Sequence, residues 1–273
     1  MNLTALVLKG KNISNSKIKR LASSLCSQHD TQAIFQNFSG ENKILDIEEA
    51  YAVQKQFVDI RLSQSRDEIA GYKIGLTSAR MQRLLGIDSP IGGFVQKKEI
   101  RFSGSVVKKS SFSKVGLECE IIVLIGRDLP PVHDKKYEFD DIESSISSVS
   151  PGFELIDDRH ADYKDIDVYT LVGDNSWNEG LVVGEFVESP VDLAGVRGML
   201  ERNGVCIETG KGADVLGHPF YAVQWLANTL TDRGLKEGDY VATGSIIPTI
   251  FPEPGESYCF TISDCGSVQV QIE

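Results

Sequence analysis

The chain has 273 residues, of which 41% are hydrophobic and 25% are charged; this predicts a globular protein with a sizeable core and excludes a disordered chain. Its 39 acidic side chains outnumber the 28 basic ones, and the net charge of −11 opposes binding to nucleic acid and to anionic membranes. A small anionic substrate would therefore need a local positive site on this protein.

The chain is expected to begin with helices. Apolar residues recur at helical spacing over 18–25, and Asp46 followed by Glu49 resembles the capping box of a second helix. The second pattern continues to Ile60, so residues up to about 66 are predicted to be helical.

From Gly71 onward, short strands are expected to dominate. Asn203-Gly204 is typical of a hairpin turn, and one helix is predicted from Pro219 to about Arg233, with Gly234 at its terminating position. Strands and helices do not alternate regularly, so the fold class is predicted to be α+β with a mixed, mostly antiparallel sheet. The apolar runs that suit strands lie at 72–74, 117–125, 151–156, 181–183 and 240–243.

Three acidic residues interrupt these predicted strands. Glu118 and Glu120 are separated by one residue, so on an extended strand they point to the same face, and Glu154 lies in another apolar run. A Glu-x-Glu pair is commonly no more than the solvated face of a strand. Here the apolar run 121–125 indicates a covered strand, and carboxylates held beside it would need a cation such as Mg²⁺.

Two further side chains are candidates for chemistry, each with a plainer interpretation. Lys73 lies in a short predicted strand between Gly71 and Gly75, where a ligand can approach closely, although most lysines are merely solvated. His218 precedes Pro219 and is interpreted as a helix cap rather than a catalytic group. The sequence lacks the motifs of serine hydrolases, P-loop proteins and dinucleotide-binding proteins.

The cysteines and the start of the sequence bear on the compartment. The five cysteines are odd in number and form no Cys-x-x-Cys pair, which argues against a disulfide framework or a zinc site. The first residues carry no cleavage-site pattern, and no stretch of the sequence reaches the ~18 apolar residues of a membrane span. We therefore expect a cytoplasmic protein.

Six short motifs occur in an order and spacing that are specific to one superfamily and less specific to one reaction. Over roughly residues 70–273 the chain resembles the 2-keto-4-pentenoate hydratase and 4-oxalocrotonate decarboxylase family of the fumarylacetoacetate hydrolase superfamily. The resemblance implies an N-terminal helical segment at 1–69 and a catalytic domain at 70–273 with a β-roll or sandwich of that type. The motifs are Gly-Tyr-Lys-Ile-Gly-Leu-Thr-Ser at 71–78, Leu-Glu-Cys-Glu-Ile at 117–121, Phe-Glu-Leu-Ile-Asp-Asp-Arg at 153–159, Gly-Asp-Asn at 173–175, Leu-Gly-His-Pro at 216–219 and Thr-Gly-Ser at 243–245.

The resemblance also implies a metal-dependent enzyme. Mg²⁺ or Mn²⁺ would be held by Glu118, Glu120 and Glu154, with Lys73 and Ser176 as acid–base groups. The substrate would be a small anionic 2-oxo or 2-hydroxydienoic acid of aromatic catabolism, and the protein would be a homo-oligomer. The residues implied to contact the substrate are Leu76, Asp174, Thr243, Gly244 and Ser245.

The sequence leaves the reaction open between alternatives. Hydratases of this kind add water to a 2-hydroxy-2,4-dienoate to give a 4-hydroxy-2-oxo acid; they tend to have an acidic residue where Ile91 stands here and a small residue in place of Trp177. A 4-oxalocrotonate decarboxylase would need a second cation for its dicarboxylate substrate, and Arg80 and Arg159 are candidates. A C–C hydrolase would need a His–Glu pair, and His29 has no evident partner. A protein that has kept the fold and lost the chemistry is a further alternative, which the intact carboxylates disfavour.

Overall fold

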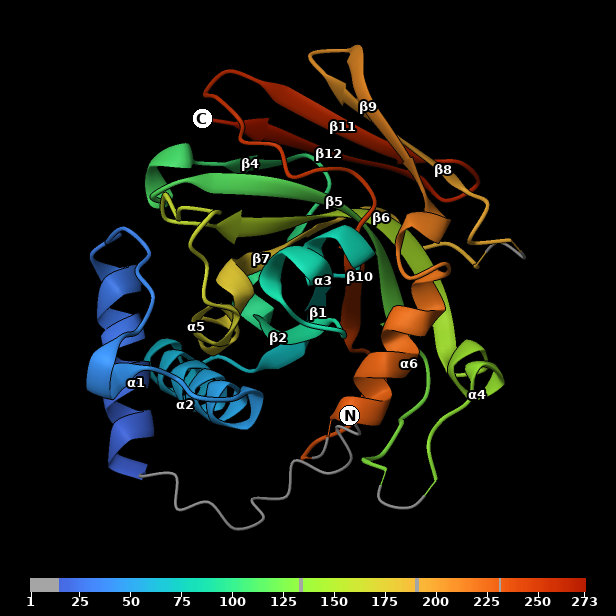
Figure 1. The fold of residues 1–273 in the computed structure, drawn as a ribbon. Helices are drawn as coiled ribbons and strands as arrows, with labels where there is room; N and C mark the ends of the chain where they lie inside the picture. The colour runs from blue at the N-terminus through green and yellow to red at the C-terminus, as the bar shows by residue number, and fades with distance from the viewer. Residues whose placement is uncertain (1–14, 133–134, 190–191, 231) are drawn as a thin grey trace.

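The structure is a computed structural model that describes residues 15–132, 135–189, 192–230 and 232–273 (Figure 1). Its helices are α1 (Asn15–Asp30), α2 (Ile47–Ser65), α3 (Ala79–Leu85), α4 (Phe139–Glu143), α5 (Val168–Gly173) and α6 (Pro219–Thr229). Its strands are β1 (Ile69–Gly75), β2 (Ile91–Gln96), β3 (Ile100–Phe102), β4 (Ser105–Val107), β5 (Val115–Ile125), β6 (Ile146–Asp157), β7 (Asn178–Val183), β8 (Arg197–Arg202), β9 (Val205–Lys211), β10 (Tyr240–Ser245), β11 (Ser257–Ile262) and β12 (Gly266–Ile272).

The strands form two mixed sheets that face each other. A seven-stranded sheet has the order β2-β1-β10-β5-β6-β7-β3, and a five-stranded sheet has the order β4-β12-β11-β8-β9. Pairing is parallel between β1 and β10, β3 and β7, and β4 and β12, and antiparallel elsewhere. The predicted α+β class with a mixed, mostly antiparallel sheet is confirmed.

The main hydrophobic core lies between the two sheets. Side chains from β5 and β6, such as Leu117 and Phe153, pack against side chains of β11 and β12, such as Phe260 and Val268. The rings of Phe153 and Phe260 have centroids 6.1 Å apart. Because β5 and β6 are the longest strands and lie near the middle of the larger sheet, they provide the rigid element on which a site can be built (Figure 1).

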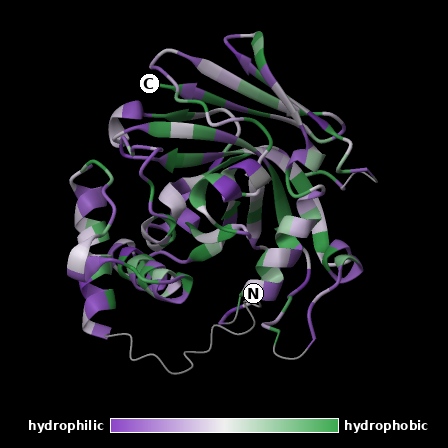
Figure 2. Ribbon diagram, viewed as in Figure 1, coloured by the Kyte–Doolittle hydropathy of each residue, from purple (hydrophilic) through white to green (hydrophobic). Residues whose placement is uncertain are grey.

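The N-terminal helices pack beside the larger sheet. Leu21 and Leu25 of α1 and Phe57 of α2 share one apolar cluster with Ile91 of β2 and with Trp177. The rest of α1 is largely hydrophilic, in keeping with its place at the edge of the molecule (Figure 2). The helical segment thus shares a core with the strand-rich part of the chain; the division at residues 69 and 70 stays a prediction.

Several predicted element ends are confirmed, and one is wrong. The Asp46 side chain caps α2 by accepting a hydrogen bond from the Glu49 N–H at 2.9 Å, and Asn203-Gly204 forms the turn between β8 and β9. His218 caps α6, its Nδ1 accepting the Phe220 N–H at 3.1 Å. Helix α6, however, ends at Thr229 and not near residue 233, because the backbone becomes extended at the next residue. In the described part of the chain, no helix is long and apolar enough to cross a membrane.

The cap of α2 supports a stability prediction. Asp46→Ala removes the acceptor for the Glu49 N–H, and the loss of a helix N-cap costs about 1 kcal/mol. We expect the free energy of unfolding, measured by urea denaturation, to fall by about that amount. Asp59→Ala, at an exposed position inside the same helix, is the matched control and should not lower it. Equal losses in both variants would contradict the capping role.

Candidate metal centre

Three carboxylates converge on one face of the larger sheet. Glu118 on β5 lies directly opposite Glu154 on β6, and Glu120 follows two residues along β5 on the same face. One carboxylate oxygen from each of the three lies within 4.8 Å of the others. Glu120 and Glu154 are fully buried, whereas Glu118 is partly exposed. The structure therefore brings together the three residues that were predicted as metal ligands.

This arrangement is unfavourable without a cation. Burial, followed by the nearby charges of Glu154 and Glu118, raises the pKa of Glu120 well above its usual range. Burial also raises the pKa of Glu154, although the Lys73 ammonium opposes the rise. Like charges directly opposite each other on paired strands destabilise a sheet, so the cluster needs a counter-charge to stay ionised.

The hydrogen bonds of the triad leave oxygens free for a metal ion. Glu120 accepts the Gly244 backbone N–H through Oε2 at 2.8 Å, and Glu118 accepts the Thr249 hydroxyl through Oε1 at 2.7 Å. Glu120 Oε1 and Glu154 Oε2, by contrast, are buried and have no hydrogen-bond partner. Buried, unpaired carboxylate oxygens beside oriented ones suit a hard divalent cation such as Mg²⁺ or Mn²⁺, which takes oxygen ligands.

Two groups hold the third carboxylate in place. Glu154 Oε1 accepts hydrogen bonds from Asn178 Nδ2 at 2.9 Å and from Lys73 Nζ at 3.0 Å. Lys73 is buried on β1, and the pKa of its ammonium is raised, because the Glu154, Glu118 and Glu120 charges outweigh the opposing effect of burial. Lys73 is therefore a charged neighbour of the triad. The plainer interpretation of Lys73 as a solvated surface lysine is excluded.

The segment Thr243–Ser245 lines the triad mainly with its backbone. Thr243 Oγ1 donates to the Ile121 carbonyl at 2.9 Å, and Ser245 Oγ donates to the Ile247 carbonyl at 2.6 Å, so both hydroxyls secure the chain. Gly244 has φ +114°, and a Cβ there would lie 2.5 Å from Thr77 Oγ1. Only glycine allows this approach of an N–H to Glu120. Direct substrate contacts by this segment stay a prediction.

A strained turn follows α5 and carries Ser176. Asn175, Ser176 and Trp177 have φ values of +53°, +51° and +63°, a left-handed conformation that costs L-residues about 1–2 kcal/mol each. The Asn175 side chain holds the turn against β2 by donating to the Phe94 carbonyl at 2.9 Å and accepting the Phe94 N–H at 2.8 Å. Ser176 Oγ and Trp177 Nε1 are buried without hydrogen-bond partners. Strain of this kind concentrates at functional sites.

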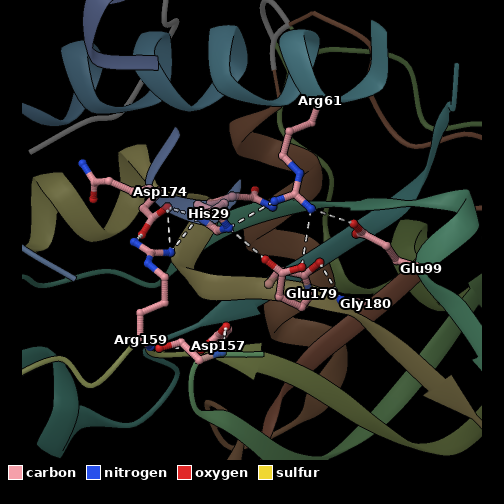
Figure 3. A network of polar contacts seen from close by, with 12 residues as sticks. His29, Arg61, Glu99, Asp157, Arg159, Asp174, Glu179 and Gly180 are labelled. Atoms are coloured by element: carbon pink, nitrogen blue, oxygen red, sulfur yellow. Dashed lines mark hydrogen bonds and ion pairs between the residues drawn. The ribbon is translucent and has the colours of Figure 1, made fainter. Parts of the chain in front are cut away.

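Asp174 lies just before this turn, with both of its oxygens engaged (Figure 3). Its Oδ1 is 2.6 Å from His29 Nε2, and its Oδ2 accepts a hydrogen bond from Arg159 Nη2 at 2.6 Å. The carboxylate is fully buried, so the part assigned to Asp174 in substrate binding stays a prediction that its side-chain contacts do not support. Arg159 is likewise committed to Asp174, and Arg80 lies exposed on α3.

The expectation that His29 lacks a partner is wrong. Its Nδ1 lies 3.0 Å from Glu179 Oε1, in addition to the Asp174 contact at Nε2 (Figure 3). Burial opposes protonation of the ring, but the two carboxylates outweigh it and raise the pKa of His29 to about 9. The partners lie about 150 residues away in the sequence, where no local pattern connects them. From the sequence, His29 could be placed only as a residue that follows the helical pattern over 18–25.

Apolar side chains adjoin the charged centre. A Cβ on Gly75 would lie 3.4 Å from Lys73 Nζ and 3.5 Å from Ile91 Cγ1, so both side chains lie close to that glycine. Ile91 is buried in the same apolar cluster as Trp177, and Leu76, with φ +56°, packs against that cluster. Leu76 thus lies near the site, although a contact between it and a substrate stays a prediction.

Two cavities lie elsewhere on the described surface. A polar cavity of about 450 Å³ is lined by residues that include His29, Arg61 and Glu179. A more apolar cavity of about 380 Å³ lies between α2 and α6, with Trp225 and Tyr72 in its wall. Neither is lined by the triad, so the metal centre is assigned from its ligand set and unpaired oxygens.

Comparisons with known proteins agree with this geometry. The sequence profile described as fumarylacetoacetate (FAA) hydrolase C-terminal matches residues 88–273. This chain belongs to the fumarylacetoacetate hydrolase family. It is 32% identical over 236 residues to a 2-keto-4-pentenoate hydratase of Paraburkholderia xenovorans (strain LB400), covering 84% of this chain and 85% of the relative. It is 31% identical over 230 residues to a 4-oxalocrotonate decarboxylase of Pseudomonas putida, covering 82% and 84%.

A solved structure of the family supports both the fold and the metal. The 4-oxalocrotonate decarboxylase from Pseudomonas putida G7, complexed with magnesium and adipate, superposes with a TM-score of 0.88 at 27% identity, covering 97% of this chain and all of that chain. The predicted fold of the fumarylacetoacetate hydrolase type is confirmed. That protein binds magnesium, and this chain has three carboxylates arranged for a divalent ion.

The triad gives a test of metal binding that does not need a substrate. Glu120→Gln keeps the shape of the side chain and its bond to the Gly244 N–H but removes one negative charge. We expect isothermal titration with MgCl₂ to show lost or strongly weakened binding, and the Mg²⁺-induced rise in melting temperature to disappear. Without Mg²⁺ the variant should melt no earlier than the parent, because repulsion within the cluster is relieved. Glu208→Gln on exposed β9 is the control; equal Mg²⁺ affinity in the Glu120 variant and this control would refute the site.

Proposed function

We propose that this protein is a divalent-metal-dependent hydro-lyase that adds water to a 2-hydroxy-2,4-dienoate and yields a 4-hydroxy-2-oxo acid. The observation that carries the proposal is the buried triad of Glu118, Glu120 and Glu154, with unpaired oxygens and a contacting Lys73. Relatives named as hydratases of 2-keto-4-pentenoate, 2-oxo-hept-4-ene-1,7-dioate and 2-hydroxyhexa-2,4-dienoate support the reaction class. We extend the proposal to Mn²⁺ as an alternative ion, to a homo-oligomeric state and to a cytoplasmic place in aromatic catabolism.

The triad would hold the ion, and the ion when bound would supply a Lewis acid that favours negative charge on the 2-oxygen of the substrate. Glu120 and Glu154 would offer their unpaired oxygens, while the Gly244 N–H and the Asn178 amide keep these carboxylates oriented. The substrate is an anion and the protein carries a net charge of −11, so the local positive charge would also overcome the general repulsion.

Lys73 and Ser176 would move the protons. Hydration requires tautomerisation of the dienol, with a proton added at one carbon, followed by addition of water at C4. The buried Lys73 ammonium would donate a proton to the substrate, because a bound divalent ion would offset the triad charges that raise the pKa of this ammonium. The unpaired Ser176 hydroxyl can hydrogen-bond to a substrate oxygen or to the attacking water.

The surrounding cations favour a substrate with a single carboxylate. A dicarboxylate would need a second positive group, but the Arg159 guanidinium is bonded to Asp174, and the Lys114 ammonium lies 2.8 Å from the buried Asp158 carboxylate. Ile91 and Trp177 add apolar surface next to the centre. The paired cations support a dienoate with a single carboxylate, and the apolar surface suits a short or apolar tail on that substrate.

A metal-dependent decarboxylase of 4-oxalocrotonate is the second candidate. Two observations support it. The chain superposes on a solved decarboxylase with a TM-score of 0.88. The apolar Ile91 lies near Lys73, so the site has one proton-transfer group fewer than a hydration would use. A C–C hydrolase is disfavoured. His29, the histidine that could activate water, has a carboxylate at each ring nitrogen; these carboxylates raise its pKa to about 9, which favours the protonated ring over the free base that water activation needs.

Product analysis distinguishes the two candidates. Metal-stripped protein is incubated with 2-hydroxypenta-2,4-dienoate or with 4-oxalocrotonate, with and without Mg²⁺, and the products are followed by mass spectrometry. We expect Mg²⁺-dependent gain of one water by the first compound. Loss of carbon dioxide from the second, with no change in the first, would replace the hydratase by the decarboxylase. Turnover that is unaffected by removing the metal would refute both.

Lys73 is tested by a neutral side chain of similar length. Lys73→Met should lower kcat by about 10²–10⁴-fold, the usual contribution of a positioned acid–base group. KM should change much less, because the metal ligands remain. The measurement is steady-state kinetics at saturating Mg²⁺, with Lys211→Met on β9 as the control. Unchanged kcat in the Lys73 variant would remove this residue from the mechanism.

A further inference from the structure

The described chain contains a second cluster of charges, buried or partly buried, on elements other than those that carry the triad (Figure 3). We refer to it as the His29 cluster; its members are His29 on α1, Arg61 on α2, Arg159 after β6, Asp174 after α5, and Glu179 on β7. His29 is its central member, because its two ring nitrogens contact carboxylates from different elements, at 2.6 Å and 3.0 Å. Asp174 is in turn bonded to Arg159 at 2.6 Å.

The cluster ties the N-terminal helices to the strand-rich part of the chain. His29 and Arg61 come from the helical segment, whereas the acidic members come from the ends of α5 and β7. Arg61 and Arg159 guanidinium nitrogens also lie 3.1 Å and 2.7 Å from the His29 ring nitrogens. Each His29 ring nitrogen therefore contacts both a carboxylate and a guanidinium, and Asp174 and Glu179 offset the positive charge that Arg61 and Arg159 bring to the ring. The geometry at His29 thus depends on all five groups being present.

The strained turn begins at the residue after Asp174. The backbone is left-handed at three successive residues, Asn175, Ser176 and Trp177. Residues other than glycine keep this conformation only when surrounding contacts enforce it. One enforcing contact is the pair of hydrogen bonds between the Asn175 amide and the Phe94 backbone. The other is the fixed Asp174 carboxylate at the start of the turn.

The turn ends at the metal centre. Asn178, the residue that follows Trp177, donates to Glu154 Oε1 at 2.9 Å. Three residues therefore separate a carboxylate held by His29 from an amide that holds a metal ligand. Between them, Ser176 Oγ and Trp177 Nε1 are buried hydrogen-bonding groups without partners, as expected of donors that await a ligand.

We propose that His29 is a positioning residue: through Asp174 it holds the turn Asn175–Trp177 in its strained conformation and so aims the Ser176 hydroxyl and the Trp177 indole N–H at oxygens of the metal-bound substrate. The N-terminal helical segment is then a working part of the active site, although it supplies neither a metal ligand nor an acid–base group. The indole N–H is a substrate-binding donor that the sequence did not indicate. This inference rests on the proposed function for the identity of the ligand only.

Trp177 itself reports on the position of the turn. The chain contains two tryptophans, Trp177 and Trp225, and Trp225 lies on α6. In a Trp225→Phe background, emission comes from Trp177 alone, whose ring is buried and packs edge-on against Phe35 with centroids 5.2 Å apart. Displacement of the turn should move this indole into a wetter environment, which shifts its emission to longer wavelength and increases its quenching by acrylamide.

The test compares His29→Gln with His160→Gln, an exposed histidine, both in the Trp225→Phe background. We expect His29→Gln to red-shift and expose Trp177, and to lower kcat about 10- to 100-fold, the usual effect of removing a supporting group. Mg²⁺ affinity, measured by titration with MgCl₂, should stay within about twofold, because the triad is intact. His160→Gln should match the parent in all three measurements. Glu179→Gln, which removes one of the two His29 carboxylates, should shift the emission in the same direction by less.

The outcomes separate positioning from general stabilisation. A His29→Gln variant that melts earlier and turns over more slowly but has the parent's Trp177 emission and quenching would overturn the inference, since the turn would be unmoved. If His29→Gln fails to fold, the Glu179→Gln emission decides in the same way. Should the parent turn over neither candidate substrate, the proposed function fails, whereas the emission of the Mg²⁺-loaded protein still shows whether His29 holds the turn.

Discussion

The structure depends on one electrostatic constraint, the meeting of three carboxylates across the β5–β6 pair. Glu118 and Glu154 are opposite each other in the register of two long antiparallel strands, and a buried Glu120 joins them from the same face. Such a cluster is tolerated because Lys73 contributes a positive charge and because oriented donors stabilise the ionised oxygens. A divalent ion bound there would complete the charge balance. The rigidity of the longest strands in the sheet is what keeps the three groups together against their repulsion.

A second constraint is the conformation of the chain beside the triad. The strained Asn175–Trp177 turn connects α5 to β7 beside Lys73, since a Cβ on Gly93 would lie 3.0 Å from Asn175 Oδ1 and 3.1 Å from Lys73 Cδ. Its cost is offset by contacts on both sides, with β2 through the Asn175 amide and with the N-terminal helices through Asp174. The polar cavity lined by His29, Arg61 and Glu179 leaves that end of the contacts next to water-accessible space, whereas Asp174 and Arg159 are buried.

The sequence predicted the parts of the site that depend on local spacing. The i, i+2 relation placed Glu118 and Glu120 on one face, and the glycines around Lys73 indicated close packing. No local spacing in the sequence reports strand register or contacts between distant residues. The position of Glu154 opposite Glu118 therefore did not follow from the pattern alone, and neither did the contact between His29 and Asp174, which are 145 residues apart. Glu154 was predicted as a third ligand from its place in a separate apolar run. The resemblance to a family supplied Ser176, but it also suggested a substrate contact for Asp174, whose oxygens are engaged elsewhere. The helix predicted over 219–233 is longer than the observed α6, because the apolar periodicity continues to Leu230, where the backbone is already extended.

The two constraints together bear on which reaction the site can support. A proton-transfer carboxylate near Lys73 would add a fourth acid to a cluster that already strains the sheet, and this chain has buried Ile91 there instead. Apolar surroundings lower the local dielectric, which strengthens both the attraction between triad and metal ion and the pairing of Lys73 with Glu154. In the proposed hydration, proton transfer would then fall to a small set of groups, Lys73, Ser176 and ordered water. Hydration remains feasible with that set because water itself is a reactant, and the site therefore depends more on accurate positioning of donors than on an additional acid or base.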